Sequence, residues 1–421
     1  MQMGGKHLQI AALLRPLAVI SAAALIAGSL AATAAAQPAT PQSPAAQPAP
    51  AELRIGYIGV AQKRVAPQPF LDAPPQDEGL AGARLGIDED NTTGRFTGQH
   101  FTLQDIEVPE KGDVAAALRE IASGGMRLVV TNLPEAPLLT IAALPEAAQM
   151  TLFNAGAADD DLRAEKCRAN LLDTLPSRAM LADALVQYLL IKQWRNVLLV
   201  VGPTDDDRAY ADAIKRSLKK FQARLVAEKP WTYQPGSRRS DTGHFSIQAE
   251  AARFTQGISY DVLVVADEED NFGDDLSYRT YDPRPVAGTQ GLKPTAWARP
   301  HQEWGATQLQ NRFLRLAKRW MTDRDYAAWL AVRSIGEAAS RAQSTDPDAV
   351  MKFMRSDKFE LGGFKGTPLN YRDWDGQMRQ AILLVDPRSL VSVSPQPGFL
   401  HQFSELDTLG IDRPETKCRL H

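Results

Sequence analysis

The sequence is poor in residues that bind metals through sulfur or imidazole. It has two cysteines, Cys167 and Cys418, and six histidines among 421 residues. No CxxC pair occurs, and the histidines lack the spacing of metal ligands. We therefore expect no bound metal.

Signatures of catalysis and nucleotide binding are also missing. The chain contains no G-x-S-x-G, Walker A, G-x-G-x-x-G or H-E-x-x-H pattern. Ser217 and Lys220 match S-x-x-K, but they lie in a charged amphipathic segment, where a chance match is the better interpretation. We predict no catalytic residues and a protein that is not an enzyme.

Charge of one sign is not in large excess. The formal net charge is -3, whereas binding to nucleic acid requires a strong basic surplus. The acidic segment at 267–275 departs from the EF-hand pattern, because Gly273 comes one place late and Tyr278 stands at the twelfth position. We interpret this segment as a solvated acidic loop, and we expect no nucleic acid partner.

The one long apolar run lies at the N-terminus. It spans residues 17–32 and leads to an A-x-A site formed by Ala34 and Ala36. This pattern is typical of a secretory signal peptide over residues 1–36, and a membrane anchor is the alternative. The Pro-rich and Ala-rich residues 37–52 have the composition of a flexible linker. We predict a periplasmic protein that is not embedded in the membrane after cleavage.

Export would place both cysteines in an oxidising compartment. A pair of cysteines tends to form a disulfide there, so we predict a bond between Cys167 and Cys418; two free buried thiols are the alternative. Such a bond would hold the C-terminal tail against the first half of the chain.

The remaining chain alternates between apolar strand-like runs and amphipathic helical segments. A helix is expected at 79–90, with a turn-rich stop at 91–98. This alternation predicts an α/β fold with two doubly wound parallel-sheet lobes, whose strand carboxyl ends border a cleft. The strands are expected at 53–60, 101–107, 128–131 and 150–154, and then at 196–202, 224–228 and 261–266.

Several of these segments are specific in combination. Together they resemble the type I periplasmic binding proteins of the branched-chain amino acid receptor group, over about residues 53–385. The segments are IGYIG (55–59), GARLGIDEDNTTG (82–94), PSRAMLADALVQYL (176–189), NVLLVVGPTDDDRAYADAIKRSL (196–218), DYAAWLAVRSIGEA (325–338) and GGFKGTPLNYRDWDGQMRQAILLV (362–385).

The resemblance implies that the chain crosses between its lobes several times through hinges. Lobe 1 would then hold residues 53–174 and 301–355, and lobe 2 would hold 175–300 and 356–392. The tail, residues 393–421, is expected to lie back on lobe 1.

A narrower resemblance concerns NAGAADDDLRAEKCRAN (154–170), RRSDTGHF (238–245), DPRPVAGTQGLKPTAW (282–297) and ELDTLGIDRPETKC (405–418). These segments are similar to a subfamily associated with pyrroloquinoline quinone (PQQ)-dependent alcohol oxidation, some members of which are implicated in binding PQQ. The resemblance implies PQQ as a bound ligand rather than a catalytic cofactor. An ABC permease or a PQQ-dependent dehydrogenase would be the partner, and we expect a monomer.

Two arginines are candidates for binding this flat polycarboxylate. Guanidinium groups pair with carboxylates and stack on π faces. Arg178 follows Pro176 and Ser177 at an expected helix start, where backbone N–H groups also attract anions. Arg239 lies in a basic loop that the resemblance places near the cleft. For both, an ordinary solvated arginine is the alternative.

Polar residues after the strands complete the predicted site. Asn132 and Asn154 each lie at the end of an apolar run and would face the cleft, unless they are satisfied turn residues. Lys63 follows the first strand and could supply positive charge. Arg279 and Trp304 lie in an aromatic and basic segment that could line the cleft mouth, although packing is the alternative for any single tryptophan.

Two other functions compete with PQQ binding. A receptor for a branched-chain amino acid or an aromatic carboxylate predicts a smaller, less cationic cleft, with a site for one carboxylate and an acid for the ammonium. An exported enzyme, or a dehydrogenase accessory protein with no ligand, predicts a catalytic set or no well-formed cleft.

Overall fold

The computed structural model describes residues 50–61, 75–231 and 247–420. The predicted signal peptide (1–36), almost all of the predicted linker, Lys63 and Arg239 lie outside the described residues. Among the described residues, no helix has both the length and the apolar character needed to cross a membrane.

The first parallel sheet has the strand order β2-β1-β3-β4-β5. Strand β1 pairs in parallel with both β2 and β3. All five residues of β3 are buried, as expected for a parallel strand that is covered on both faces. The strands are β1 (Ala51–Val60), β2 (Gln99–Val108), β3 (Leu128–Asn132), β4 (Thr151–Asn154) and β5 (Leu171–Asp173).

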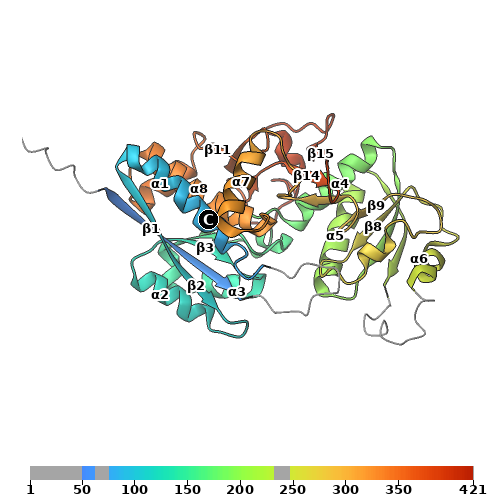
Figure 1. Ribbon diagram of the computed structural model, residues 1–421, viewed down its shortest axis with the longest axis horizontal. Coiled ribbons are helices and arrows are strands. Elements are labelled where there is room, and N and C mark those ends of the chain that lie inside the picture. The colour runs from blue at the N-terminus through green and yellow to red at the C-terminus, as the bar shows by residue number, and fades with distance from the viewer. Residues whose placement is uncertain (1–49, 62–74, 232–246, 421) are drawn as a thin grey trace, which may run out of the picture. The chain divides into compact units, whose positions relative to one another are not determined.

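Helices cover both faces of this sheet (Figure 1). On one face, α2 (Val114–Ser123) and α3 (Glu135–Ala142) pack in one apolar core. The other face packs against α1 (Leu80–Thr97), α7 (Ala306–Ala317), α8 (Asp323–Ala342) and α9 (Pro347–Met354). We call this sheet with its helices lobe 1.

Helix α1 is longer than predicted. The turn-rich stop expected at 91–98 is wrong, because the helix continues to Thr97 and is capped by Gly98. The side chain of Asn91 bonds to the backbone of Phe101 on β2, and Thr92 Oγ1 donates to Asp88 O at 3.0 Å. Asn91 and Thr92 are residue types that favour turns in isolation. Here Asn91 bonds the helix to β2, and Thr92 bonds to the preceding turn of the helix.

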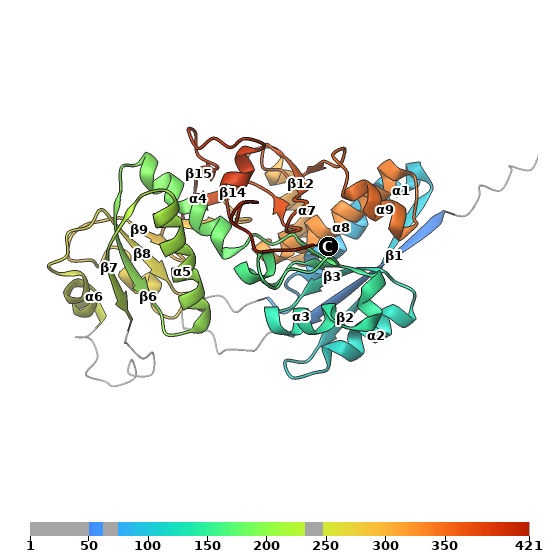
Figure 2. The ribbon, with the colours of Figure 1, turned by 180° about the vertical axis from the view of Figure 1, so that it is seen from behind.

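The second parallel sheet has the strand order β7-β6-β8-β9. Its strands are β6 (Asn196–Val201), β7 (Arg224–Pro230), β8 (Val262–Ala266) and β9 (Val286–Gly288). Helices α4 (Arg178–Ile191) and α5 (Asp205–Lys220) pack on one face, and α6 (Ile247–Thr255) packs on the other (Figure 2). We call this sheet with its helices lobe 2.

Side-chain caps define where the key helices begin. Thr204 and Asp207 form a capping box at the start of α5, and Thr322 and Asp325 form another at the start of α8. Such caps satisfy backbone N–H groups that have no partner within a helix. The start of α8 borders the cleft described below, and α5 contributes Tyr210 to its lining.

Two small antiparallel sheets contain the last strands. Strands β10 (Lys293–Thr295), β14 (Ile382–Val385) and β15 (Leu390–Ser394) form one sheet, and Leu384 of β14 packs in the core of lobe 2. The other sheet holds β11 (Leu361–Gly362), β12 (Pro368–Tyr371) and β13 (Met378–Arg379).

The second of these sheets differs from the sequence-based assignment of 356–392 to lobe 2. Leu361, Leu369 and Met378 pack in the core of lobe 1. The chain therefore returns to lobe 2 only near β14.

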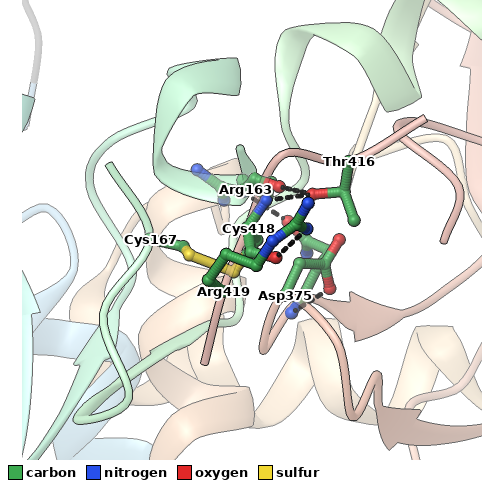
Figure 3. The surroundings of a disulfide bond; sticks show 7 residues. Arg163, Cys167, Asp375, Thr416, Cys418 and Arg419 are labelled. Atoms are coloured by element: carbon green, nitrogen blue, oxygen red, sulfur yellow. Dashed lines mark hydrogen bonds between the residues drawn. A yellow bond between two sulfur atoms is a disulfide. The ribbon is translucent and has the colours of Figure 1, made fainter. Parts of the chain in front are cut away.

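Cys167 and Cys418 form the predicted disulfide (Figure 3). The bond joins residues separated by 251 positions in sequence. It fixes the C-terminal end of the chain to the loop that precedes β5.

A buried lysine lies beside the crossovers between the lobes. Lys365 is 1% exposed, and its Nζ donates to Gln380 Oε1 at 2.8 Å and to Ala381 O at 2.9 Å. Burial lowers the pKa of Lys365 to about 7. Gln380 donates in turn to Thr174 O, just before α4.

We expect Lys365→Met to flatten the pH dependence of stability. Between pH 7 and the ordinary lysine pKa, the unfolded chain binds more protons at this site than the folded chain does, so stability rises with pH. From pH 7 to pH 9, the wild type should gain about 2 kcal/mol relative to the variant. Urea unfolding at pH 7, 8 and 9 measures this difference, and parallel pH curves would contradict it.

Candidate functional site

A cleft of about 580 Å³ lies between the two lobes. Lobe 2 contributes the carboxyl ends of β8 and β9, and lobe 1 contributes the starts of α1 and α8. This is where doubly wound sheets bind their ligands, and the volume suits a small solute. The lining residues are Glu78, Ala158, Leu175, Pro176, Leu181, Tyr210, Asp267, Glu268, Asp270, Gly288, Thr289, Lys293, Pro294, Thr295, Ala296, Trp297, Ala298, Thr322, Asp323, Arg324 and Val385.

Acidic groups outnumber basic groups in the described lining. The acids are Glu78, Asp267, Glu268, Asp270 and Asp323, and the bases are Lys293 and Arg324. The cationic cleft expected from the sequence is therefore not what the described lining forms. Both signs of charge are nevertheless present, as a zwitterion would require.

Several of these acids hold the cleft wall in place. Asp267 accepts backbone N–H groups from Asn271, Phe272 and Gly273, at 2.7 to 2.9 Å, and burial raises its pKa. Asp323 accepts from Thr295 Oγ1 at 2.6 Å. These contacts order the loops that follow β8 and β10.

The acidic segment at 267–275 is thus not simply the solvated loop that we expected. Asp267, Glu268 and Asp270 line the cleft, because the segment follows directly from the carboxyl end of the buried strand β8. The apolar run DVLVVA (261–266) could have indicated this position, since the residues that follow such a strand face the ligand in this class of fold.

Two polar lining residues have side-chain groups without a hydrogen-bond partner among the described residues. Tyr210 on α5 is 2% exposed, and its hydroxyl has no hydrogen-bond partner among the described residues. Lys293 is exposed at the start of β10, and its side-chain amine makes no hydrogen bond or ion pair within the described chain. Both residues lie in segments quoted for the resemblances, 196–218 and 282–297, but no local pattern of the sequence marks either side chain as one that faces the cleft.

Arg178 is at the predicted helix start, but carboxylates of the protein surround it. Its guanidinium contacts Glu268 at 2.7 and 2.8 Å, Asp159 at 2.8 Å and Asp206 at 2.8 Å. Burial opposes its charge, yet these carboxylates raise the pKa of Arg178. Because Asp159 follows β4 in lobe 1 and the other two acids lie in lobe 2, Arg178 bridges the lobes.

The two asparagines are the last residues of buried strands, Asn132 in β3 and Asn154 in β4. Asn132 Nδ2 donates to Glu78 O at 2.8 Å and so supports the turn before α1. Asn154 is fully buried; its Nδ2 donates to Asp173 Oδ1 at 2.7 Å, and its Oδ1 accepts from Ala157 N at 2.9 Å. Both side-chain amides thus donate within the protein, as the alternative interpretation expected, but the residues end strands and do not lie in turns.

The aromatic and basic segment is divided between surface and cleft. Arg279 Nη1 pairs with Asp275 at 2.8 Å, and Trp304 is half exposed beside Gly366; neither residue lines the cleft. Trp297 does line it, and its ring stacks on Tyr326 with centroids 4.7 Å apart.

The described residues contain no group of three or more His, Cys, Asp or Glu side chains that could hold a metal ion. Three of the cleft acids, Asp267, Glu268 and Asp270, lie close together in sequence, and each accepts hydrogen bonds from backbone or side-chain donors of the protein.

The sequence matches no protein-family model and no curated protein. Its fold is similar to that of solved binding proteins. One is a branched-chain amino acid ABC transporter periplasmic ligand-binding protein from Burkholderia xenovorans. The TM-score is 0.64 at 16% identity, over 81% of this chain and 95% of that one.

Two other similar structures contain an amino acid. An ABC transporter substrate-binding protein from Desulfitobacterium hafniense, in complex with leucine, gives a TM-score of 0.61 at 15% identity, over 80% of this chain and 99% of that one. A branched-chain amino acid transporter substrate-binding protein from Streptococcus pneumoniae, in complex with isoleucine, gives 0.58 at 14% identity, over 81% and 98%. The predicted fold class is confirmed: the chain has the type I periplasmic binding protein fold.

Proposed function

We propose that this chain is a periplasmic solute-binding protein of an ABC-type transport system and that it binds an amino acid between its lobes. The observation that carries the proposal is the cleft of about 580 Å³, which both lobes line at the positions where this fold binds ligands. This role requires that the protein bind and release a solute, and it requires no catalytic step.

The lining supports an amino acid better than a polycarboxylate. An ammonium group finds acids on the lobe 2 wall, such as Asp270, and a carboxylate finds Lys293 or Arg324. PQQ would bring several carboxylates to a described lining in which acids are in excess, and Arg178 is already paired with three carboxylates. Because two of the similar structures contain leucine or isoleucine, a branched-chain amino acid becomes the leading candidate.

PQQ stays a prediction from the subfamily resemblance, together with a dehydrogenase partner and the role of Arg239. An ABC permease is the partner that the proposed function requires. A solute-binding protein of this kind would close its lobes on the ligand through contacts that are present only in the closed state.

Calorimetric titration of the signal-free protein with leucine, isoleucine, benzoate and PQQ tests the proposal. We expect saturable binding of an amino acid. Lys293→Gln should weaken it about 10-fold or more, the value of a charge-assisted hydrogen bond. Tyr210→Phe should weaken it about 3-fold to 10-fold. Lys111→Gln, at an exposed lysine outside the cleft, is the control and should bind as the wild type does.

Tight binding of PQQ without binding of any amino acid would overturn the proposed ligand and favour the subfamily resemblance. Equal binding by Lys293→Gln, Tyr210→Phe and the wild type would contradict the assigned lining.

A further inference from the structure

The C-terminal segment, residues 405–418, contacts both lobes. We call it the strap. It begins with a short 3-10 helix (Glu405–Thr408) and ends at the disulfided Cys418. Its contacts lie on α4 and α5 of lobe 2, on the β12–β13 hairpin of lobe 1, and on the loop before β5.

The contacts with lobe 2 centre on a buried acid. Asp183 on α4 has a fully buried side chain, which accepts from Gly410 N at 2.9 Å and pairs with Lys220 at 2.9 Å. Lys220 Nζ also donates to Thr408 O at 3.0 Å and to Gly410 O at 3.1 Å. Arg216 Nη2 donates to the same Gly410 carbonyl at 2.5 Å. Arg216 and Lys220 of α5 therefore hold the strap through hydrogen bonds to its backbone carbonyl groups.

The contacts with lobe 1 are equally buried. Asp407 of the strap accepts from Arg372 Nε at 2.9 Å and from Arg379 Nε at 2.8 Å. Arg372, whose side chain is 1% exposed, also donates to the strap carbonyl of Leu409 at 2.7 Å. Both arginines belong to the hairpin that packs in the lobe 1 core, Arg372 directly after β12 and Arg379 at the end of β13. Breaking a buried pair of this kind is costly, because it leaves an uncompensated charge.

The end of the strap is held covalently. Cys418 is bonded to Cys167, and Thr416 Oγ1 donates to Arg163 O at 2.8 Å (Figure 3). Arg163 itself is buried and donates to Leu175 O at 2.8 Å, in the crossover that leads to α4. The strap is thus anchored where the chain leaves lobe 1 for lobe 2.

The residues of α5 that bind the strap lie far from the cleft. Tyr210 of this helix lines the cleft, whereas Arg216 and Lys220 come six and ten residues later. At 1.5 Å per residue, these positions lie about 9 and 15 Å further along the helix axis. The strap can therefore restrain the lobes without occupying the ligand site.

We propose that the strap is a covalently anchored tie that limits how far the lobes separate. Rotation of lobe 2 away from lobe 1 must either carry Gly410 away from Asp183 or pull Asp407 from its arginines. The disulfide between Cys167 and Cys418 prevents the end of the strap from detaching from lobe 1. The restraint is independent of which solute the cleft binds.

Distance measurement between the lobes tests this proposal in the ligand-free protein. Spin labels on a non-cysteine unnatural amino acid at exposed Ala116 in lobe 1 and exposed Arg253 in lobe 2 leave the native disulfide intact. Two variants release opposite ends of the strap: Arg216→Gln with Lys220→Gln, and Cys418→Ser. We expect each to add a population at longer inter-label distance.

Lys215→Gln is the matched control, because Lys215 lies on the same helix but pairs with Asp212 and Glu228 rather than with the strap. It should leave the distance distribution unchanged. If distributions of the folded strap variants superimpose on that of the wild type, the proposal is wrong. Should Cys418→Ser fail to fold, the Arg216→Gln with Lys220→Gln variant still decides, since it keeps the disulfide.

Discussion

Replacing both Cys167 and Cys418 by serine should lower the free energy of unfolding by about 4 kcal/mol. The bond closes a loop between residues 251 positions apart. The chain-entropy relation gives about 5.5 kcal/mol for so long a loop, and residual structure in the unfolded chain reduces this value. The cysteines join segments held otherwise by polar contacts such as Lys417 with Glu165. Urea unfolding of oxidised protein and of the double variant measures the difference.

Wild-type protein treated with a dithiol is the matched control, and its unfolding midpoint should fall with that of the variant. A change below about 1 kcal/mol, with an unchanged denaturant slope, would contradict the account. It would mean that the tail is held by its ion pairs alone.

Gly82→Val should destabilise the chain by about 3 kcal/mol or more. Gly82 lies on α1 where α8 crosses it, and a Cβ there would be 1.8 Å from the carbonyl oxygen of Asp325. The neighbour is backbone at a capping box, so the two helices would have to move apart. Overpacking of this kind costs about 1–3 kcal/mol and occasionally more.

Gly362→Ala provides the comparison, because a Cβ at Gly362 meets nothing within 4 Å. It should change stability by no more than about 0.5 kcal/mol. Similar thermal midpoints for the Gly82 and Gly362 variants would show that α1 and α8 are not in tight contact.

The strands of both lobes could be predicted because each is a short apolar run. The runs expected at 128–131 and 196–202 correspond to β3 (Leu128–Asn132) and β6 (Asn196–Val201). Their character follows from burial on both faces, which requires apolar residues throughout.

Features that depend on tertiary contact were harder to predict. The end of α1 was placed too early, because Asn91 favours a turn in isolation but bonds to β2 in the fold. Gly82 gave no local sign that a second helix crosses there. The short helix α9 (Pro347–Met354) was also missed.

In the candidate site, too, some features could be predicted from local sequence and others depend on tertiary contacts. The cleft position followed from the strand carboxyl ends, but the burial of Asn154 and the pairing of Arg178 depend on which side chains meet. The acidic segment at 267–275 was predicted to be a solvated loop from its charge and its departure from the EF-hand pattern, neither of which reports where the segment lies in the fold. Its position after β8 would have indicated otherwise.

Solute binding between the lobes is the central claim, and a variant that fills the cleft tests it most directly. Ala158 lines the cleft, so the indole ring of Ala158→Trp should project into the space where the solute would lie. Ala116→Trp, on an exposed helix position, is the matched control. In calorimetric titrations with leucine and isoleucine, the account predicts saturable binding by the wild type and the control, and none by Ala158→Trp. Undiminished binding by Ala158→Trp would contradict the account, because the solute would then bind outside the cleft.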